Sequence, residues 1–458
     1  MEHIEAFSAR FAGLVWGLPL VFLLFGAGVL FTVLHGGIQF RMFRHAVNIV
    51  RGKYDNPEDT GEISHFQALC AALSATIGLG NIAGVAVAVT AGGPGAVFWM
   101  WVAGLLGMAT KYTEVSLAMI YREKDEEGHV HGGPMFTIKN ALGRAFLPLA
   151  ALYAFFTMCS SMGAGNMFQS NNMAAALEAG YGVPRWFSGL AFCALAGVVL
   201  IGGIKRIGRV AGRLVPVMVV LYFIGAIGII LWHLPRVPGM LLSIVSGAFT
   251  GTAAVGGFAG VGVREVLVQG VRRAVFSNEA GMGSAAMAHS AAKTEVPIRE
   301  GMVALLEPFI DTVVVCTLTA LALLLTGVWK DPQGLSGAPL TAAAFAQVYG
   351  RGGAAIVDLA VVLFAFSTII SWSYYGEQGA DYLFGLKGIP YYRWVFIGFI
   401  FIGAVWKLGP VIDLSDAMFG LMALPNLVAS FLLIGKLSKE TRKYIRDYKA
   451  GGFKRTDL

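Results

Sequence analysis

The sequence has 458 residues, of which 56% are hydrophobic and 13% are charged, and its mean hydropathy is +0.69. This balance excludes an ordinary soluble domain and predicts an integral membrane protein. The formal net charge of +7 does not indicate a nucleic-acid partner, because the Lys and Arg residues gather in particular loops, where they report membrane orientation. The four cysteines lie in apolar runs without the spacing of a zinc site, so we expect neither disulfides nor zinc.

Apolar runs of about 20 residues predict about eleven transmembrane helices in an all-α fold. In chain order they lie near residues 12–34, 65–90, 95–121, 146–178, 187–203, 214–233, 264–291, 301–328, 352–384, 392–406 and 411–435. The first run has no small-residue cleavage site behind it, so we expect a retained helix rather than a removed signal peptide. Segments 123–144 and 330–350 are too short to fold alone, so residues 1–458 are predicted to form one transmembrane domain.

The distribution of basic residues predicts the orientation of the chain. Lys and Arg cluster at 41–53, at 122–144 and at 205–213, and Lys293, Arg299, Lys387 and a basic tail at 436–458 continue the alternation, so these segments should be cytoplasmic. The N-terminus is then outside and the C-terminus inside, in a multi-pass protein of the cytoplasmic membrane. The candidate helix 264–291 carries charges in its outer half, so hydropathy alone would not predict this helix.

Two of the predicted helices are broken by a Gly-x-Gly flanked by small polar residues, at Ser74–Asn81 and at Ser277–Ser284. Glycine weakens a helix by about 1 kcal/mol, and unwound backbone inside a bilayer persists only where it lines a cavity or binds something. Without helix 12–34, the breaks fall in the first and sixth of the remaining helices. This predicts two five-helix repeats of opposite orientation, 65–235 and 262–435, with a binding site at the membrane midplane.

The chemistry of the breaks predicts a small zwitterionic substrate and a monovalent cation. A broken helix exposes amides and carbonyls at one depth, each end carrying about half an elementary charge. A carboxylate would lie against the amides of Gly78 to Asn81, and an amine against the carbonyls near Val275 to Ser277. Hydroxyl and amide side chains surround the breaks, which favours a hard cation, with sodium as first choice.

Other interpretations of the same pattern stay open. Small residues and hydroxyls also serve helix packing, and Trp372 could simply fill the core. Glu307 and Asp311, four residues apart on one helical face, could form a proton relay, so a proton-coupled amino-acid symporter is an alternative. His129 and His131 lie in a charged loop and are expected to be solvated. A membrane-embedded enzyme or a channel is disfavoured, since we find no H-E-x-x-H, G-x-S-x-G or repeated filter motif.

Several stretches resemble the alanine or glycine:cation symporter family. In order along most of the chain they are TIGLGNIAGVA at 76–86, GMATKYTEV at 107–115, HGGPM at 131–135, NMFQSN at 166–171, FSNEAGMGSA at 276–285 and SWSYYGEQ at 371–378. The resemblance implies a leucine-transporter-like fold, with two inverted five-helix repeats and an extra N-terminal helix. It also implies sodium-driven uptake of a small neutral amino acid, alanine or glycine in L or D form, with a glutamine-preferring relative as an alternative.

The resemblance further implies the site residues. The expected substrate contacts are Thr76, Gly78, Gly80, Asn81, Asn166, Gln169, Phe276, Asn278 and Trp372, and sodium would lie between carbonyls near Ser74 and Ile77 and the hydroxyls of Ser367 and Thr368. We expect no catalytic residue, no organic cofactor, no nucleic acid and no metal except co-transported sodium, so that the partners are an amino acid, sodium and membrane lipid. The chain departs from the family pattern at Leu79 and Gln378.

Overall fold

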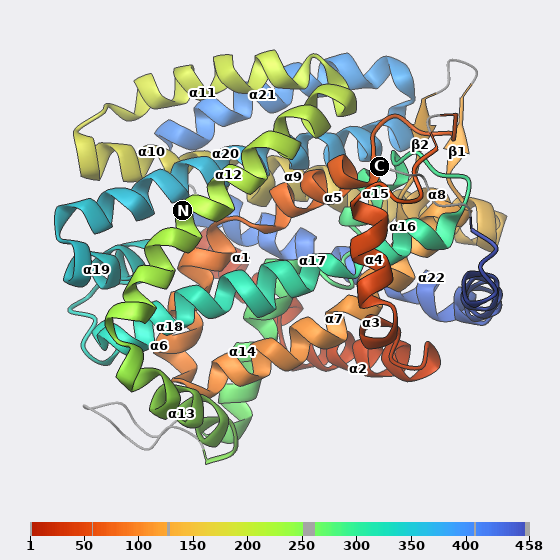
Figure 1. Cartoon of the computed structure of the whole chain (residues 1–458). Helices are drawn as coiled ribbons and strands as arrows, with labels where there is room; N and C mark the ends of the chain where they lie inside the picture. The colour runs from red at the N-terminus through yellow and green to blue at the C-terminus, as the bar shows by residue number, and fades with distance from the viewer. Residues whose placement is uncertain (1, 57, 126–128, 251–261, 407–408, 454–458) are drawn as a thin grey trace.

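The structure is a computed structural model that describes residues 2–56, 58–125, 129–250, 262–406 and 409–453 (Figure 1). Within these ranges the chain is helical, except for loops and one antiparallel pair of two-residue strands, β1 (Glu123–Lys124) and β2 (Val130–His131). Residues 454–458 of the predicted tail lie outside the described residues.

The first half of the chain forms two N-terminal helices and the first part of a bundle. Its elements are α1 (Glu2–Val15), α2 (Leu18–Leu34), α3 (Ile38–Arg41), α4 (Phe43–Val50), α5 (His65–Thr76), η1 (Gly80–Gly84), α6 (Val85–Gly92), α7 (Gly95–Ile120), α8 (Pro134–Leu142), η2 (Arg144–Phe146), α9 (Leu147–Met162), η3 (Gly163–Met167), α10 (Phe168–Tyr181), α11 (Arg185–Leu200) and α12 (Gly203–Trp232).

The second half completes the bundle. Its elements are η4 (Leu234–Arg236), α13 (Val237–Thr250), α14 (Val263–Asn278), α15 (Ala285–Ser290), α16 (Pro297–Ala304), α17 (Leu306–Pro308), η5 (Phe309–Cys316), α18 (Thr317–Thr326), η6 (Val328–Lys330), α19 (Ala338–Tyr349), α20 (Arg351–Phe384), η7 (Leu386–Gly388), α21 (Ile389–Val405) and α22 (Gly409–Lys449).

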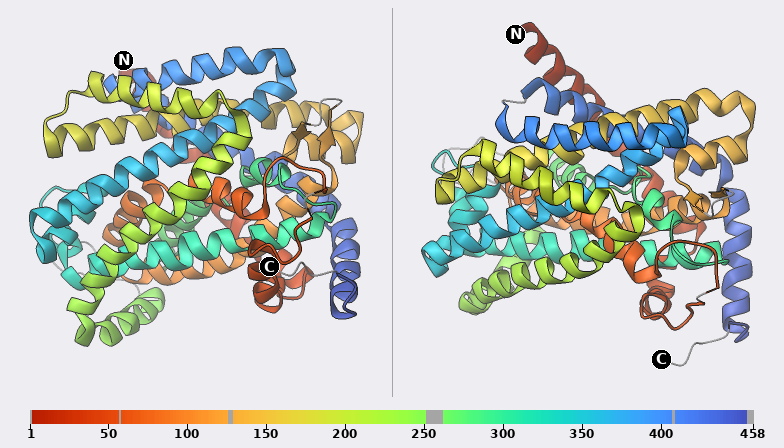
Figure 2. Two further views of the ribbon diagram at one scale, coloured as in Figure 1. Left: turned by 45° about the horizontal axis from the view of Figure 1, so that its top comes forward. Right: turned by 90° about the horizontal axis from the view of Figure 1, so that it is seen from above.

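The helices form two groups that meet at the breaks. In one group α7 packs against α14, α16 and α2, and in the other α9 and α10 pack against α20, while α11 lies beside α21 (Figures 1 and 2). Helix α5 contacts both α16 and α20 and so joins the groups. Small residues allow the close contacts, since a Cβ added at Gly270 of α14 would lie 2.5 Å from the Ala96 carbonyl oxygen of α7.

Local sequence explains where the first broken helix begins. Ser64 and Gln67 form a capping box: the Ser64 hydroxyl accepts from the Gln67 amide at 3.2 Å, and the Gln67 side chain accepts from the Ser64 amide at 3.0 Å. Two orphan amides at the start of α5 are therefore satisfied without water. The helix is held in place before it reaches the break.

The start of α5 is tied to the segment that follows α15. Ile63 and Ala292 form a parallel bridge, and the Arg122 guanidinium donates to the carbonyls of Thr60 and Ser290 at 3.0 and 2.9 Å. It also donates to the Ala292 carbonyl at 2.8 Å. The two broken helices are thus linked at one end, away from the breaks.

Among the described residues, seven helices are long and apolar enough to cross a membrane, or up to eight if the bent pair α5 and η1–α6 counts as one span. All eleven predicted ranges lie mainly in helix, but α11 has only 16 residues and the helix predicted at 264–291 is interrupted between α14 and α15. The chain is therefore an all-helical integral membrane protein, and the count of eleven stays a prediction.

The helices differ from the expectation in several places, and α3, α4 and α8 lie outside the eleven predicted ranges. The predicted tail after residue 435 continues α22 to Lys449, and α22 has 41 residues, about 62 Å, which exceeds a hydrocarbon core of about 30 Å. Figure 2 shows its C-terminal part, in dark blue, at the edge of the molecule. Segment 330–350 contains α19, which packs on α20, and α13 was not anticipated.

Candidate substrate and ion site

The first break lies between α5 and η1, where the helix axis bends by 52°. Ile77 ends the helical conformation with a ψ of 89°. The Asn81 side chain then bridges the break, because its Oδ1 accepts from the Gly78 amide at 2.9 Å while its Nδ2 donates to the Asp311 carboxylate at 2.7 Å. Asn81 thus holds the break open and ties it to η5.

The second break comprises residues 279–284, between α14 and α15. Glu279 has a φ of +57°, an uncommon conformation for a residue with a side chain, and Gly281 and Gly283 follow with φ of +97° and +77°. Glycine adopts these angles without steric penalty. The backbone of this segment therefore requires glycine at both positions of the Gly-x-Gly.

Side chains from neighbouring helices satisfy the polar backbone of the second break. Tyr153 Oη donates to the Met282 carbonyl at 2.9 Å, and Asn426 Nδ2 donates to the Gly281 carbonyl at 2.8 Å. The Gly281 amide in turn donates to the Glu114 carboxylate at 3.2 Å. Non-helical backbone at membrane depth needs such partners, and here α7, α9 and α22 provide them.

A cavity of about 40 Å³ lies between the two breaks. Residues from seven elements and from both breaks line it: Ala75, Thr76, Gly78, Leu79, Gly80, Ala164, Phe168, Gln169, Phe276, Glu279, Thr368, Trp372 and Phe419. Pockets for drug-sized molecules measure roughly 300–1,000 Å³. This cavity suits a small solute.

Aromatic rings wall one side of the cavity. The Phe419 ring lies 5.8 Å from that of Phe276 and 5.6 Å from that of Trp372, centroid to centroid. Trp16, from the turn between α1 and α2, packs on Phe419 at 5.9 Å, and its Nε1 donates to the Asp416 carbonyl at 2.9 Å. Such ring pairs contribute about 0.5–1.5 kcal/mol each beyond burial, so the N-terminal helices support the wall.

The residues predicted to bind sodium converge between α5 and α20. Ser74 Oγ donates to the Ser367 carbonyl at 2.7 Å, and Ser367 Oγ donates to the Ser74 carbonyl at 3.2 Å. A Cβ added at Gly78 would lie 2.8 Å from Thr368 Oγ1, which places that hydroxyl against the break. Ile77 is fully buried at the end of α5. Hydroxyl and carbonyl oxygens from both helices therefore lie close together.

The predicted substrate contacts divide into two sets. Thr76, Gly78, Gly80, Gln169, Phe276 and Trp372 line the cavity. Asn81, Asn166 and Asn278 lie outside its lining: Asn166 Nδ2 donates to the Phe396 carbonyl of α21 at 2.7 Å, and Asn278 Nδ2 donates to Thr312 Oγ1 at 2.9 Å. In this conformation, these three amides hold helices together.

A chain of buried ionisable side chains lies beside the second break, and sequence reasoning found only one of its members. Lys111 Nζ is 3.3 Å from Glu307 Oε2, and Glu307 Oε1 is 2.6 Å from His289 Nε2. His289 Nδ1 is 2.5 Å from Glu300 Oε1, and Glu300 also pairs with His65. All five side chains are at most 1% exposed. In a membrane protein such groups need partners, and each has one.

The ends of this chain point in different directions. Glu114, which binds the second break, lies 3.9 Å from Lys111, while Asp55, 3.9 Å from His65, has a side chain that is 42% exposed. Asp311 stands apart from the chain, because its carboxylate accepts from Asn81, Ser277 and Thr312. Glu307 and Asp311 share a helical face but have separate partners.

The expectation that His131 is solvated is wrong. Its side chain is 12% exposed, with Nδ1 2.6 Å from Asp381 Oδ2 and Nε2 3.2 Å from Asp125 Oδ2. The hydrogen bond to Asp381, with a smaller contribution from Asp125, raises the pKa of His131 to about 9 although burial opposes this. At neutral pH the imidazolium therefore ties β2 to the end of α20.

Comparison with known proteins decides the family. The model of the sodium:alanine symporter family matches residues 1–457. The chain belongs to the sodium:alanine symporter family. The sodium/alanine symporter AgcS of Methanococcus maripaludis is 42% identical over 434 residues, which cover 94% of this chain and 95% of that protein. An uncharacterized transporter of Haemophilus influenzae is 41% identical over 457 residues, 99% of each chain.

Solved structures show the fold alone. The manganese transporter of Eremococcus coleocola matches with a TM-score of 0.54 at 13% identity, over 82% of this chain and 83% of that chain. The fold of this chain is therefore that of a membrane transporter. At 13% identity, the substrate of the neighbour says nothing about the substrate of this chain. Membership of the sodium:alanine symporter family supports a function as a sodium-coupled amino-acid transporter.

Proposed function

We propose that the protein takes up a small neutral amino acid, alanine or glycine, together with sodium, by alternating access. The observation that carries this is the small cavity that lies between two unwound helix breaks. The substrate carboxylate would face the amides of Leu79 and Gly80 at the start of η1, as anions do at helix N-termini. The amine would face the carbonyls that end α14, beside Phe276.

Sodium would bind between α5 and α20. The Ser74 and Ile77 carbonyls and the Ser367 and Thr368 hydroxyls would supply oxygen ligands, replacing the mutual hydrogen bonds of Ser74 and Ser367. Because Thr368 also lines the cavity, the ion and the amino acid would share one wall. Coupling is then reciprocal, since each ligand raises the affinity for the other by the same factor.

The proposed architecture is two inverted repeats, α5 to α12 and α14 to α22, with the N-terminus outside and the basic end of α22 in the cytoplasm. One charge crossing the membrane gains roughly 2.3 kcal/mol per 100 mV, and about 1.4 kcal/mol corresponds to tenfold. One sodium ion per substrate therefore supports accumulation of more than tenfold without ATP, and no enzymatic step is needed.

Proton coupling is the second candidate, and the buried chain from Lys111 to His65 favours it. Every contact in this chain joins two groups that can exchange a proton, and it leads to the partly exposed Asp55. Uptake that persists in choline and collapses with the pH gradient would identify this mechanism.

The decisive experiment is uptake of radiolabelled alanine into proteoliposomes, with sodium or choline outside and unlabelled amino acids as competitors. We expect sodium-dependent accumulation that alanine and glycine compete away, and its loss in Asn81→Ala. Asn172→Ala is the matched control, because the Asn172 amide donates to the Phe168 carbonyl of its own helix at 2.8 Å. Absence of uptake under every cation gradient would refute the proposal.

A further inference from the structure

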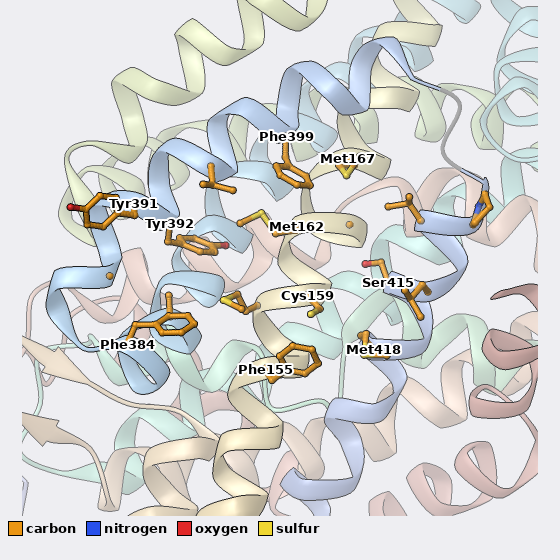
Figure 3. Close-up of a pocket in the computed structure, with 18 of the residues that line it drawn as sticks. Phe155, Cys159, Met162, Met167, Phe384, Tyr391, Tyr392, Phe399, Ser415 and Met418 are labelled. Atoms are coloured by element: carbon orange, nitrogen blue, oxygen red, sulfur yellow. The ribbon is translucent and has the colours of Figure 1, made fainter. Parts of the chain in front are cut away.

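A second, much larger hollow lies on the side of the bundle, apart from the substrate cavity. It measures about 1110 Å³ and lies between α9, α20, α21 and α22, with α1 at one end. Figure 3 shows side chains of these helices directed into a common space, among them Phe155, Cys159, Met162, Phe399 and Met418. We call this hollow the lateral groove.

The lateral groove extends along most of the thickness of a bilayer's hydrocarbon core. One end is marked by Lys387, in the turn before α21, and the other by Pro410 and Val411, at the start of α22. Between these ends lies α21, whose 17 residues extend about 25 Å. The hydrocarbon core of a bilayer is about 30 Å thick, so an occupant would be elongated and aligned with the lipid chains.

The chemistry of the lateral groove differs sharply between its middle and its end. Its middle is lined by aromatic, aliphatic and methionine side chains, and methionine adapts to irregular, flexible ligands. Among the described residues that line the groove, Lys387 is the charged one, and Tyr391 lies one turn after it. A long apolar ligand with an anionic group at one end fits this arrangement. The position of Tyr391 agrees with it, because tyrosine is enriched at membrane–water interfaces.

We propose that the lateral groove binds an anionic phospholipid, with one acyl chain along α9 and α21 and its phosphate at Lys387. The loop containing Lys387 is cytoplasmic in the proposed orientation, where anionic lipids attract basic side chains by about 1 kcal/mol each. The volume exceeds the roughly 300–1,000 Å³ of pockets for drug-sized molecules, so a lipid tail can enter. This inference does not depend on which amino acid is transported.

The lateral groove shares a wall with the substrate cavity. Met162, Gly163 and Met167 line the groove, whereas Ala164, within the same π-helical turn η3, lines the cavity. The Ala164 amide donates to Ser415 Oγ of α22 at 2.6 Å, which fixes this turn against the groove's other wall. A bound acyl chain would therefore support the thin partition on which Gln169 and its neighbours depend.

The test uses photoreactive phosphatidylglycerol, with a diazirine on its acyl chain, in vesicles of phosphatidylcholine that contain the purified protein. After illumination, peptide mass spectrometry locates the adducts. We expect labelling of segments 155–167 and 384–399, competed by unlabelled phosphatidylglycerol. Lys387→Glu should reduce it by about fivefold or more, because about 1 kcal/mol corresponds to that factor.

Matched variants and probes make the result decisive. Lys439→Glu alters an exposed lysine on the same membrane side, away from the groove, and should leave the labelling unchanged. Cys159→Trp fills the middle of the groove and should remove adducts while Lys387 is intact. Adducts absent from both segments would overturn the proposal. So would equal labelling by a phosphatidylcholine probe, or labelling by a fatty-acid probe but not by phosphatidylglycerol. None of these readouts requires transport.

Discussion

Replacing His289 with alanine tests whether the buried ionic chain stabilises the bundle. Both ring nitrogens face carboxylates, at 2.5 Å from Glu300 and 2.6 Å from Glu307, and both can donate only in the imidazolium form. The alanine variant leaves two carboxylates in a fully buried position without their shared partner. Breaking a buried ion pair in this way destabilises a protein by about 3–5 kcal/mol.

This free energy translates into a measurable melting shift. Unfolding entropy amounts to about 2.1 cal/mol/K per residue, so 458 residues that melt together lose about 1 kcal/mol of stability per degree. His289→Ala should therefore lower the melting temperature of the detergent-solubilised protein by about 3–5 °C. Cys70 and Cys316 are buried, so a thiol-reactive dye can follow the transition.

The control and a double variant decide the interpretation. His233→Ala, in which the lost contact is to the Ile229 carbonyl of the same helix, should shift the transition by less than about 1 °C. His289→Ala combined with Glu307→Gln should be less destabilised than the sum of the single variants, by about 0.5–3 kcal/mol. A melting temperature near that of the wild type, or strict additivity, would show that the contacts carry no such energy.

Three further predictions concern the cavity, the ion and pH. Gly165→Ala places a Cβ 2.5 Å from the Trp372 side chain, and such overpacking costs about 1–3 kcal/mol. The variant should therefore distort the cavity wall and reduce the maximal rate of alanine uptake. An unchanged rate would contradict this. Thr368→Ala should raise the sodium concentration for half-maximal uptake by about tenfold to a hundredfold, because a lost contact to a charge costs about 1.5–3 kcal/mol. Thr326→Ala, at the end of α18, should leave it unchanged. The pKa of His131 is raised to about 9 in the folded protein against about 6.5 unfolded, so its stabilisation is complete below pH 6.5 and disappears as pH rises through 9. The difference in melting temperature between wild type and His131→Gln should therefore shrink across that window, and a constant difference would exclude the ion pairs as its cause.

The position of the breaks could be predicted from the sequence because each Gly-x-Gly is flanked by small polar residues, a pattern that favours unwound backbone over helix packing alone. Gly281 and Gly283 adopt positive φ angles, and Gly78 leaves room for the Thr368 hydroxyl. The cavity lies between these two segments, as the pattern predicts. Which lining residues contact a substrate stays a prediction.

Most of the other residues of the site could not be predicted from the local sequence. Phe168 and Phe419 line the cavity, yet an apolar residue in a membrane helix reads as ordinary packing. His65 and Glu300 are 235 positions apart, and their pairing depends on how α5 packs near α16. Asn166 and Asn278 lie close in sequence to residues that line the cavity, but their amides bond to Phe396 and Thr312, because the direction of each side chain follows from helix rotation, which hydropathy does not determine.

Helix α22 extends from the cavity wall to the segment that contains α4. It carries Phe419, against the cavity, and Tyr444, whose hydroxyl is 2.7 Å from His45 Nε2 on α4. These residues are 25 positions apart, a lever arm of about 38 Å. Pro425 lies between them and lacks the amide that would bond to the preceding turn, which makes it a natural joint. A displacement of the C-terminal end of α22 would therefore act on the cavity wall through this joint.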